Sequence, residues 1–505
     1  MLLGERVKHL AFMLWVGVTT SGALAMSACT RTLNVDVKVV SPCNQPDVLS
    51  GDQFLRIRVE GASLDTPRVS EFDVSAHRGA VMNVPITQAA MISVLAYASD
   101  LTLPPDVAGG LGSLDLTGAR ANVSARVQVG HVSTFMGTTS DNACTKINQG
   151  RQGHTLTTLA DGTVLIAGGE QLTNNESTLV RATEIYEPAS GTFTQGPDLP
   201  EGRAYHTATL LQTGRVLLCG GEGVENNRAA SLRSCQLYDP DSKTFLNSPP
   251  SMAIGRMDHT ATLLADGRVA ITGGRGIPTD YYRQTEVYDT ATGIFTSAPD
   301  MRTARSQHSA TLMSDGVHIL IAGGLEGTTV KGDVELWSVT ATVAAGTLSQ
   351  SRYAHGAALL GDGRVIIGGG MIDAPLGANP TVTSSVEVYD GEQTGLVCPS
   401  GLSLSEARGR VVAVSLPKPS GGVLFVGGTS LNGAISAAGD VVTAGNNRSC
   451  QEIAIHASAG TLAHPRTRAQ AAVLTGGEVL IVGGSSSTGP TASPVVEGEL
   501  FVSPR

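Results

Sequence analysis

A pair of adjacent glycines returns at regular intervals along residues 151–505 of this chain, each time directly after a short apolar run. A period near 50 residues is typical of propellers and related arrays, because each unit buries its faces only against its neighbours. The repeat therefore predicts a closed array of similar units. The seven copies are Gly168-Gly169, Gly220-Gly221, Gly273-Gly274, Gly323-Gly324, Gly369-Gly370, Gly427-Gly428 and Gly483-Gly484.

Each copy has the pattern of a four-stranded antiparallel sheet. Two apolar strands flank a turn such as Asp266-Gly267, and Asp-Gly supplies the positive φ angles that a tight hairpin needs. A variable loop follows the glycine pair and leads to a third strand, in which an acid or amide precedes an aromatic by two residues, as in Glu286-Val287-Tyr288. A fourth strand is expected around a phenylalanine such as Phe295.

The glycine pair, the Glu-x-Tyr-Asp segment, the phenylalanine and a returning Arg-x-x-His together resemble the kelch repeat. In that family each repeat forms one four-stranded blade of a β-propeller. The resemblance covers residues 151–505 and implies an all-β fold with a seven-bladed kelch-type β-propeller, which we place at residues 141–505.

Closure of the ring requires a fourth strand for the seventh copy, because Glu499-Leu500-Phe501 stands close to the last residue of the sequence. We expect residues 144–148 to supply this strand, since Phe135 lies farther upstream. The first and last blades would then share hydrogen bonds and leave no open sheet edge.

The sixth copy departs most from the repeat. Val411 stands where other copies have histidine, the hairpin turn is longer through Lys418-Pro419-Ser420, and Ala454 occupies the expected aromatic position. We expect this blade to be irregular. The Gly-, Ala- and Ser-rich segment 429–449 is interpreted as a flexible flap.

Residues 29–140 lack the repeat and show strands of a different kind. Polar and apolar residues alternate in segments 33–39, 54–59 and 123–129. Period-two alternation indicates half-buried antiparallel strands. We expect a small Ig-like or fibronectin-like β-sandwich before the propeller, acting as a stalk.

The first 28 residues have the layout of a secretory signal peptide, with Arg6 and Lys8 before an apolar run and small residues. The segment that ends in Ala28-Cys29 resembles the lipobox of bacterial lipoproteins, which implies lipidation of Cys29 and a membrane anchor. Thr30, rather than Asp, follows the cysteine and favours the outer membrane in that class. An ordinary signal peptide with a chance cysteine, and hence a secreted protein, is the alternative.

Six further cysteines form an even set, which in an exported chain predicts up to three disulfides. Sequence alone leaves fifteen pairings open. Cys43 with Cys144 would fasten the two domains together, Cys219 with Cys235 would join two strands of the second blade, and Cys398 with Cys450 would remain for the fifth and sixth blades. The formal charge of −10, with no basic run, argues against nucleic-acid binding.

Five Arg-x-x-His pairs share one phase of the repeat, and their histidines could together ring the channel mouth and bind a metal or an acidic ligand. A residue repeated in every blade usually serves the blade itself, so we interpret these histidines as structural, each satisfying backbone groups at its strand start, and expect no metal site. The acids of the Glu-x-Tyr segments are interpreted as structural too. The pairs are Arg151/His154, Arg203/His206, Arg256/His259, Arg305/His308 and Arg352/His355.

Function is better sought in the loops after the glycine pairs, which differ between blades. In one of them, Asp280, Tyr281, Tyr282 and Arg283 place two aromatics beside two charges in an aromatic-poor chain, and could stack on a sugar or anchor a protein. Packing of these tyrosines on the blade below is the equally weighted alternative.

No catalytic signature is present: neither a nucleophile elbow nor a zinc, phosphate-loop or dinucleotide motif. Galactose-oxidase-type enzymes resemble this chain in placing a β-sandwich before seven blades, yet no copper ligand carries over to its residues. We therefore expect a non-catalytic binding or scaffold module without a cofactor, which recognises a cell-surface protein or polysaccharide through its loop face. A carbohydrate-active or oxidase-like enzyme that uses the same face is the alternative.

Overall fold

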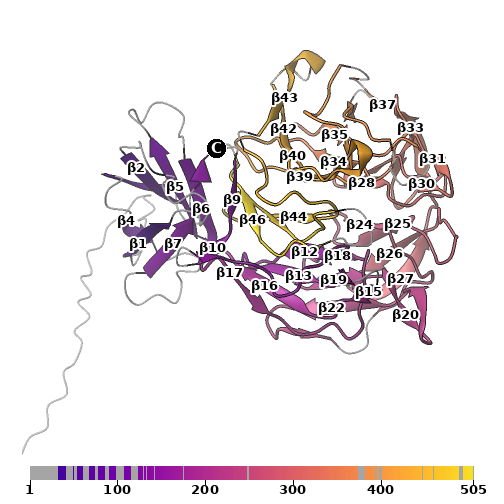
Figure 1. The fold of residues 1–505 in the computed structure, drawn as a ribbon, viewed down its shortest axis with the longest axis horizontal. Helices are drawn as coiled ribbons and strands as arrows, with labels where there is room; N and C mark the ends of the chain where they lie inside the picture. Colours follow the sequence, from indigo (N-terminus) through magenta and orange to yellow (C-terminus); the bar gives the residue numbers. More distant parts are fainter. Residues whose placement is uncertain are drawn as a thin grey trace, which may run out of the picture.

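A computed structural model gives the fold of the chain (Figure 1). It describes residues 32–503 except 41–48, 50–53, 61–66, 74–77, 86–89, 98–106, 115–122, 129, 132–133, 141–142, 174–175, 247–249, 374–380, 393–394, 397, 399–400, 446, 448, 459 and 488–492. The expected leader at residues 1–28, the lipidation site Cys29, and Cys43 lie outside the described residues. No helix in the described residues is long and apolar enough to cross a membrane.

Seven four-stranded antiparallel sheets follow one another along the described part of the chain and form the blades of a propeller (Figure 1). Blades one to three are β12 (Thr155–Thr158), β13 (Val164–Ala167), β16 (Thr183–Glu187), β17 (Thr192–Gln195); β18 (Thr207–Leu210), β19 (Val216–Cys219), β22 (Cys235–Asp239), β23 (Thr244–Phe245); and β24 (Thr260–Leu263), β25 (Val269–Thr272), β26 (Thr285–Asp289), β27 (Ile294–Ala298). Blades four and five are β28 (Ser309–Leu312), β29 (Ile319–Ala322), β32 (Asp333–Trp337), β33 (Thr342–Thr347); and β34 (Gly356–Leu359), β35 (Val365–Gly368), β36 (Val386–Asp390), β37 (Gly395–Leu396). Blades six and seven are β39 (Val412–Ser415), β40 (Val423–Val426), β42 (Gly439–Ala444), β43 (Ile453–Ala457); and β44 (Gln470–Val473), β45 (Val479–Val482), β46 (Glu499–Phe501) and β9 (Phe135–Gly137).

Short hairpins and turns decorate the blades. They are β10 (Thr139–Ser140) with β11 (Ala143–Cys144), β14 (Glu170–Thr173) with β15 (Glu176–Leu179), β20 (Glu222–Glu225) with β21 (Arg228–Ser231), β30 (Leu325–Glu326) with β31 (Thr329–Val330), β38 (Arg408–Gly409) with β41 (Thr429–Ser430), and the 3-10 helices η2 (Leu431–Gly433) and η3 (Cys450–Glu452). The expectation of an all-β, seven-bladed propeller is confirmed.

The second strand of every blade is buried along its whole length, as in β19 and β25. It lies in the middle of its sheet and between two neighbouring blades, so both of its faces are covered. In one cluster, Leu217 and Cys219 of the second blade pack with Val269, Ile271 and Tyr288 of the third. The hydrophobic core therefore runs from blade to blade around the ring.

The ring is closed by β9, and not by residues 144–148 as the sequence suggested. β9 pairs with β46, with Phe135 opposite Phe501. In the third blade the phenylalanine of the fourth strand, Phe295, lies ten residues before the next repeated arginine, Arg305. Phe135 lies sixteen residues before Arg151, which is six residues more than this spacing. The hairpin β10–β11 takes up the extra residues, which is why the upstream phenylalanine looked too distant.

The third strand of the sixth blade also differs from expectation. β42 occupies that place, so Asp440 is its acid and Val442 stands opposite Val423, where other blades have an aromatic. Ala454 lies in the fourth strand, β43. The segment 429–449 is consequently not a free flap, because it contains β42 in the centre of the blade.

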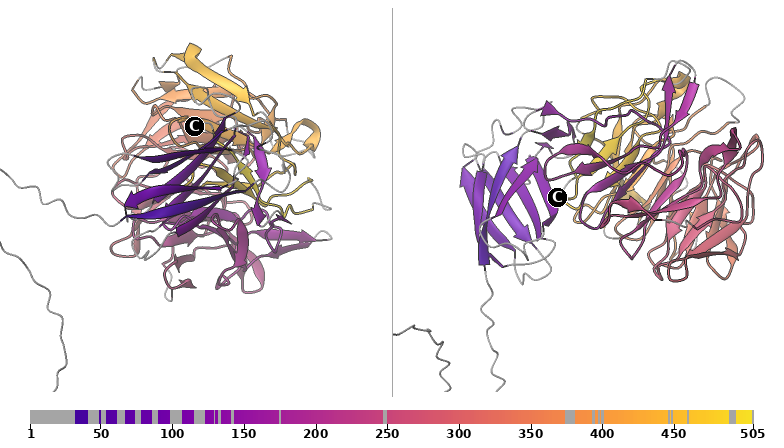
Figure 2. Two further views of the ribbon diagram at one scale, coloured as in Figure 1. Left: turned by 90° about the vertical axis from the view of Figure 1, so that its left-hand side faces the viewer. Right: turned by 90° about the horizontal axis from the view of Figure 1, so that it is seen from below.

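The N-terminal residues form two sheets beside the propeller (Figure 2). One sheet has the order β4-β1-β7 and the other β3-β2-β5-β6-β8. Their strands are β1 (Thr32–Val40), β2 (Phe54–Glu60), β3 (Arg68–Asp73), β4 (Arg78–Pro85), β5 (Ala90–Tyr97), β6 (Val107–Leu114), β7 (Val123–Gln128) and β8 (Gly130–His131). Val35 and Ile57 are buried while Asp36 and Arg58 are exposed, so the alternation in the sequence marks the inner faces of a sandwich.

Two disulfides are described, and both match the pairs suggested from the sequence. Cys219 and Cys235 stand directly opposite each other on β19 and β22, and Cys398 joins Cys450 across 52 residues. Cys144 is also disulfide-bonded.

Candidate functional site

The glycine pairs hold neighbouring blades together through the backbone. The second glycine of every pair donates its amide hydrogen to the carbonyl of the buried arginine that opens the next blade, and the last pair returns to the first blade. This arginine begins an Arg-x-x-His in five blades, whereas Val411 and Ala469 replace the histidine in blades six and seven. The seven bonds, 2.8 to 2.9 Å long, are Gly169 to Arg203, Gly221 to Arg256, Gly274 to Arg305, Gly324 to Arg352, Gly370 to Arg408, Gly428 to Arg466 and Gly484 to Arg151.

The first glycine of each pair makes room for the next blade. At Gly220 the φ angle is +66°, and a Cβ there would lie 2.5 Å from the carbonyl oxygen of Arg256 and 2.8 Å from the ring of His259. Any side chain at this position would push the blades apart. The repeated Gly pair and the Arg-x-x-His are thus two halves of one joint.

The repeated arginines are buried and pair with the acid of the third strand. Arg256 donates to Glu286 at 2.8 Å and also to the backbone carbonyls of Gly273 and Gln284. Burial lowers the pKa of Arg256, and Glu286 opposes that shift. The second blade differs, because Gln236 replaces the acid and Arg203 instead lies 3.4 Å from Glu201. The structural interpretation of these arginines and acids agrees with this packing.

The repeated histidines contact backbone groups, as His259 does at Arg256, and they also link side chains of adjacent blades, which the sequence did not suggest. In four blades the Nε2 atom lies 2.9 to 3.2 Å from a hydroxyl on the first strand of the preceding blade: His206 to Thr155, His259 to Thr207, His308 to Thr260 and His355 to Ser309. Burial, with the nearby arginine, lowers the pKa of His259 to about 3, so the imidazole is neutral. Within the described residues, no cluster of His, Cys, Asp or Glu could hold a metal ion.

The residue directly before each histidine of the motif, and its counterparts Arg410 and Arg468, share a backbone conformation but not a side chain. This residue has a positive φ angle in all seven blades. In blades two to six its amide donates to the carbonyl of the same residue one blade earlier, as from Tyr205 to Gly153 (2.7 Å) and from Arg410 to Ala354 (2.7 Å). The backbone at this position repeats while the side chain changes from blade to blade. The seven residues, hereafter the inner ring, are Gly153, Tyr205, Asp258, Gln307, Ala354, Arg410 and Arg468.

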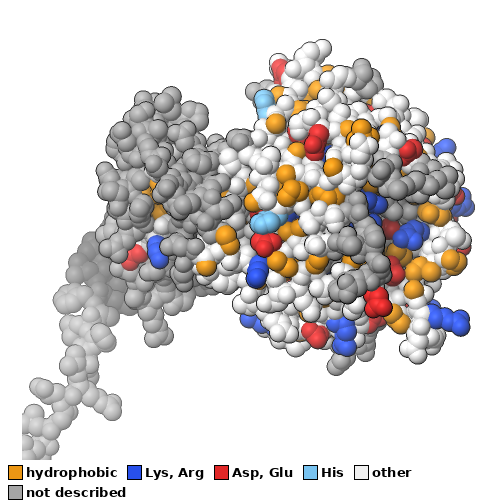
Figure 3. Space-filling model, viewed as in Figure 1, with side chains coloured by type: hydrophobic (Ala, Val, Ile, Leu, Met, Phe, Trp, Pro, Cys, Tyr) orange, Lys and Arg blue, Asp and Glu red, His pale blue; other side chains and the backbone are white. Residues whose placement is uncertain are grey.

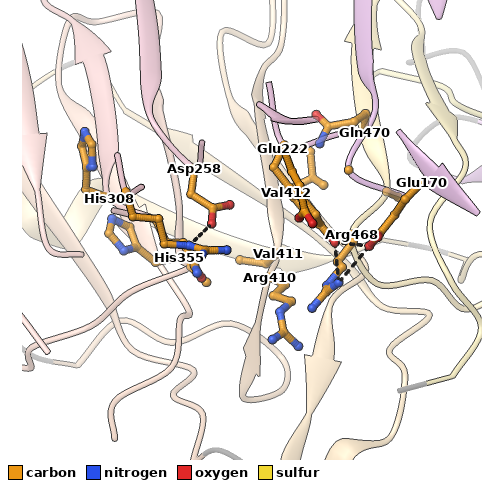
Figure 4. Close-up of a pocket in the computed structure, with 16 residues that line it drawn as sticks. Glu170, Glu222, Asp258, His308, His355, Arg410, Val411, Val412, Arg468 and Gln470 are labelled. Carbon is orange, nitrogen blue, oxygen red and sulfur yellow. Dashed lines mark hydrogen bonds and ion pairs between the residues drawn. The ribbon is translucent and has the colours of Figure 1, made fainter. Parts of the chain in front are cut away.

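The inner ring lines a cavity of about 510 Å³ (Figure 4). Glu170, Glu222 and Arg275, each directly after a glycine pair, line it as well. Each of these three pairs through its backbone with the residue before the inner-ring position, as in Met257 with Arg275. The cavity therefore opens on the face from which the loops after the glycine pairs emerge.

Two networks of polar side chains cross the cavity. Arg275 donates to Asp258 at 2.8 Å. The hydroxyl of Tyr205 donates to Glu170 and accepts from Arg468 at 2.8 Å, and the Arg468 guanidinium lies over the Tyr205 ring. Burial raises the pKa of Tyr205, so the phenol stays protonated and acts as a donor.

No protein-family model matches the chain. It is 24% identical over 143 residues to an F-box/kelch-repeat protein of Arabidopsis thaliana, a match that covers 26% of this chain and 29% of that protein. The seven repeated sheets and their joints establish a β-propeller, and this similarity supports repeats of the kelch type. The fold is that of a kelch-repeat propeller. A solved structure of YjhT is 13% identical in sequence and superimposes with a TM-score of 0.48. The match covers 62% of the present protein and 99% of YjhT.

The loop residues singled out from the sequence lie on the same face of the kelch-repeat propeller but outside the lining of the cavity. Tyr282 is half-buried with its ring over the Arg256 guanidinium, at 5.6 Å, so it packs on its own blade. Asp280 is exposed, and Arg283 lies 3.4 Å from Asp300. Tyr281 is half-buried and remains the aromatic candidate for a ligand contact.

Sequence reasoning missed the inner ring of the kelch-repeat propeller. The signal was present in the third position of each Arg-x-x-His, which varies between Gly, Tyr, Asp, Gln and Ala while the arginine and the histidine of the motif repeat. The fold fixes the backbone at such a position but does not demand a particular side chain there. On the face seen in Figure 3, charged side chains are scattered over the propeller in small groups, so no single-sign patch competes with this cavity there.

Proposed function

We propose that this kelch-repeat propeller is an exported, lipid-anchored and non-catalytic binding module that recognises an envelope or extracellular protein or polysaccharide through its loop face. The inner ring carries this proposal. Seven equivalent backbone positions present seven side chains around one cavity, and Tyr205, Asp258 and Arg410 differ in size, charge and hydrogen-bonding capacity. Side chains that break the symmetry of a ring are free to fit a ligand that has no such symmetry.

The export part of the proposal rests on the sequence. Arg6 and Lys8 precede an apolar run that ends at Ala28-Cys29, and two disulfides are described in the propeller. Disulfides persist in oxidising compartments. The expected sandwich before the propeller would hold the cavity away from the membrane.

An enzyme that uses the same cavity is the second candidate. Blade-specific acids and a tyrosine meet at the channel mouth, as a catalytic site requires, and they include Glu170, Glu222 and Tyr205. Burial and the nearby Glu170 raise the pKa of Glu222, which moves its carboxyl toward the range useful in general acid–base catalysis.

A glycan array and a panel of purified envelope proteins, both probed with the full chain, test the binding proposal. We expect binding that Gln307→Ala weakens, because Gln307 lines the cavity, and that Gln212→Ala leaves unchanged, because Gln212 lies in an exposed hairpin turn. Tyr281→Ala measures the contribution of the loop. Absence of binding to both panels would overturn the proposal, and turnover of a bound glycan would establish the enzyme instead.

A further inference from the structure

Six charged side chains line the described cavity, three acids and three arginines. Two acids are already matched by arginines. Asp258 accepts from Arg275 at 2.8 Å, and Glu170 lies 3.9 Å from Arg468 with Tyr205 between them. One group of each sign is left over.

The two remaining groups are Glu222 and Arg410. Among the described residues, neither side chain makes a hydrogen bond or an ion pair. They do not pair with each other because Glu222 follows the second strand of blade two, whereas Arg410 precedes the first strand of blade six. The fold holds both side chains at the cavity and keeps them on different blades of the ring.

Like charges stand beside each leftover group. Burial and the neighbouring Arg468 lower the pKa of Arg410 to about 10. Burial and the neighbouring Glu170 raise the pKa of Glu222, and Arg275 opposes that shift. Figure 4 shows the Arg410 and Arg468 guanidinium groups close together. Each leftover group thus has a neighbour of its own sign and no ion-pair partner among the described residues.

An uncompensated charge in a partly buried site costs free energy, and a ligand charge of opposite sign recovers it. A purely anionic ligand would satisfy Arg410 but would leave Glu222 unmatched. A neutral ligand would leave both groups without a counter-charge. Only a ligand that carries both charges matches the two leftover groups together.

We propose that the cavity at the channel mouth binds a zwitterionic ligand, its anionic group at Arg410 and its cationic group at Glu222. This inference rests on the proposed binding function and names the ligand chemistry of the same site. The cavity, at about 510 Å³, lies within the range of roughly 300–1,000 Å³ that small-molecule sites occupy.

A series of ω-amino acids tests the proposal, since it varies the separation of the two charges. Ligand-observed NMR with the full chain would measure glycine, 4-aminobutanoate and 6-aminohexanoate, with hexanoate and hexylammonium as single-charge controls. We expect one member of the series to bind at least about tenfold more tightly than either control, because each charge-assisted contact adds roughly that factor.

Variants locate the two ends of the ligand. Arg410→Gln should weaken both the zwitterion and hexanoate about tenfold, whereas Glu222→Gln should reduce the zwitterion to the affinity of hexanoate and leave hexanoate unchanged. Arg302→Gln and Glu225→Gln, at exposed positions outside the cavity, serve as matched controls and should bind as the parent does. Circular dichroism melts of each variant separate a binding defect from unfolding.

Equal binding of hexanoate and 6-aminohexanoate would overturn the proposal in favour of a simple anion site. Failure of the whole series to bind would overturn it as well. If the same preparation still bound its glycan or protein panel, the binding-module proposal would survive and only the zwitterion would be rejected.

Discussion

The ring of Phe135 lies 5.1 Å from the ring of Phe501, and this contact joins β9, which precedes the first blade in sequence, to the third strand of the seventh blade. The same aromatic pairing recurs inside other blades, as between Tyr288 and Phe295 at 5.0 Å. In those blades one hairpin supplies both residues. In the seventh blade the two residues come from opposite ends of the repeat, so their pairing closes the ring.

Phe135→Ala should destabilise the propeller by about 3 to 5 kcal/mol, the usual cost of removing a buried phenylalanine. Urea denaturation followed by circular dichroism measures the change. Ile294→Ala, at an exposed position of β27, is the matched control and should shift stability by no more than about 0.5 kcal/mol. Equal effects of the two substitutions would contradict closure through β9.

The buried histidines should make the protein less stable in acid. The pKa of His259 is about 3 in the folded chain and near 6.5 when exposed, so between these values only the unfolded state takes up the proton. The free energy of unfolding therefore falls as the pH drops from about 6.5 toward 3.

His259→Gln removes one of these titrating groups and keeps a polar group that can hydrogen-bond with Thr207. Only the parent loses stability through this histidine on acidification. The difference in free energy of unfolding between parent and variant should therefore narrow by about 2 kcal/mol from pH 7 to pH 4.5, as measured by urea denaturation at each pH. His456→Gln, at an exposed position, should leave the gap unchanged. A gap of the same size at both pH values for His259→Gln would refute the expectation.

The described disulfides should resist alkylation until a reductant is added, which intact mass spectrometry detects. Replacement of Cys398 and Cys450 by serine should cost about 4 kcal/mol, and replacement of Cys219 and Cys235 about 3 kcal/mol, because the first pair closes the longer loop. Free thiols at these positions in exported protein would rule out the pairing.

Cys29→Ala should abolish the proposed lipid anchor. Fractionation and intact mass should find the variant soluble or still carrying its leader, whereas the parent should sediment with membranes and carry the mass of a diacyl group. Membrane association that the substitution does not change would remove the lipoprotein proposal. Cys450→Ala would be a poor control because it breaks a disulfide, so Ser27→Ala, two residues before Cys29, is the appropriate one.

Much of the fold can be predicted from short stretches of the sequence. The glycine pairs, the Asp-Gly turns and the acid before each aromatic mark the same places in successive blades, and each reflects a local backbone or packing need. Gly220 shows this directly, since the close approach of Arg256 and His259 leaves no room for a Cβ. Pairing of Cys219 with Cys235 also follows from the repeat, because these residues are opposite each other on adjacent strands.

The closing strand and the cavity depend on contacts between residues that are distant in sequence. β9 is separated from the seventh blade by six intervening blades, and the inserted hairpin β10–β11 hides its register. Glu222 and Arg410 likewise share a cavity only because the ring closes. The sequence by itself determined the repeating unit and the number of units, since those follow from local turns and strands. Tertiary structure alone decided which variable side chains meet, because their meeting depends on the closure of the whole ring.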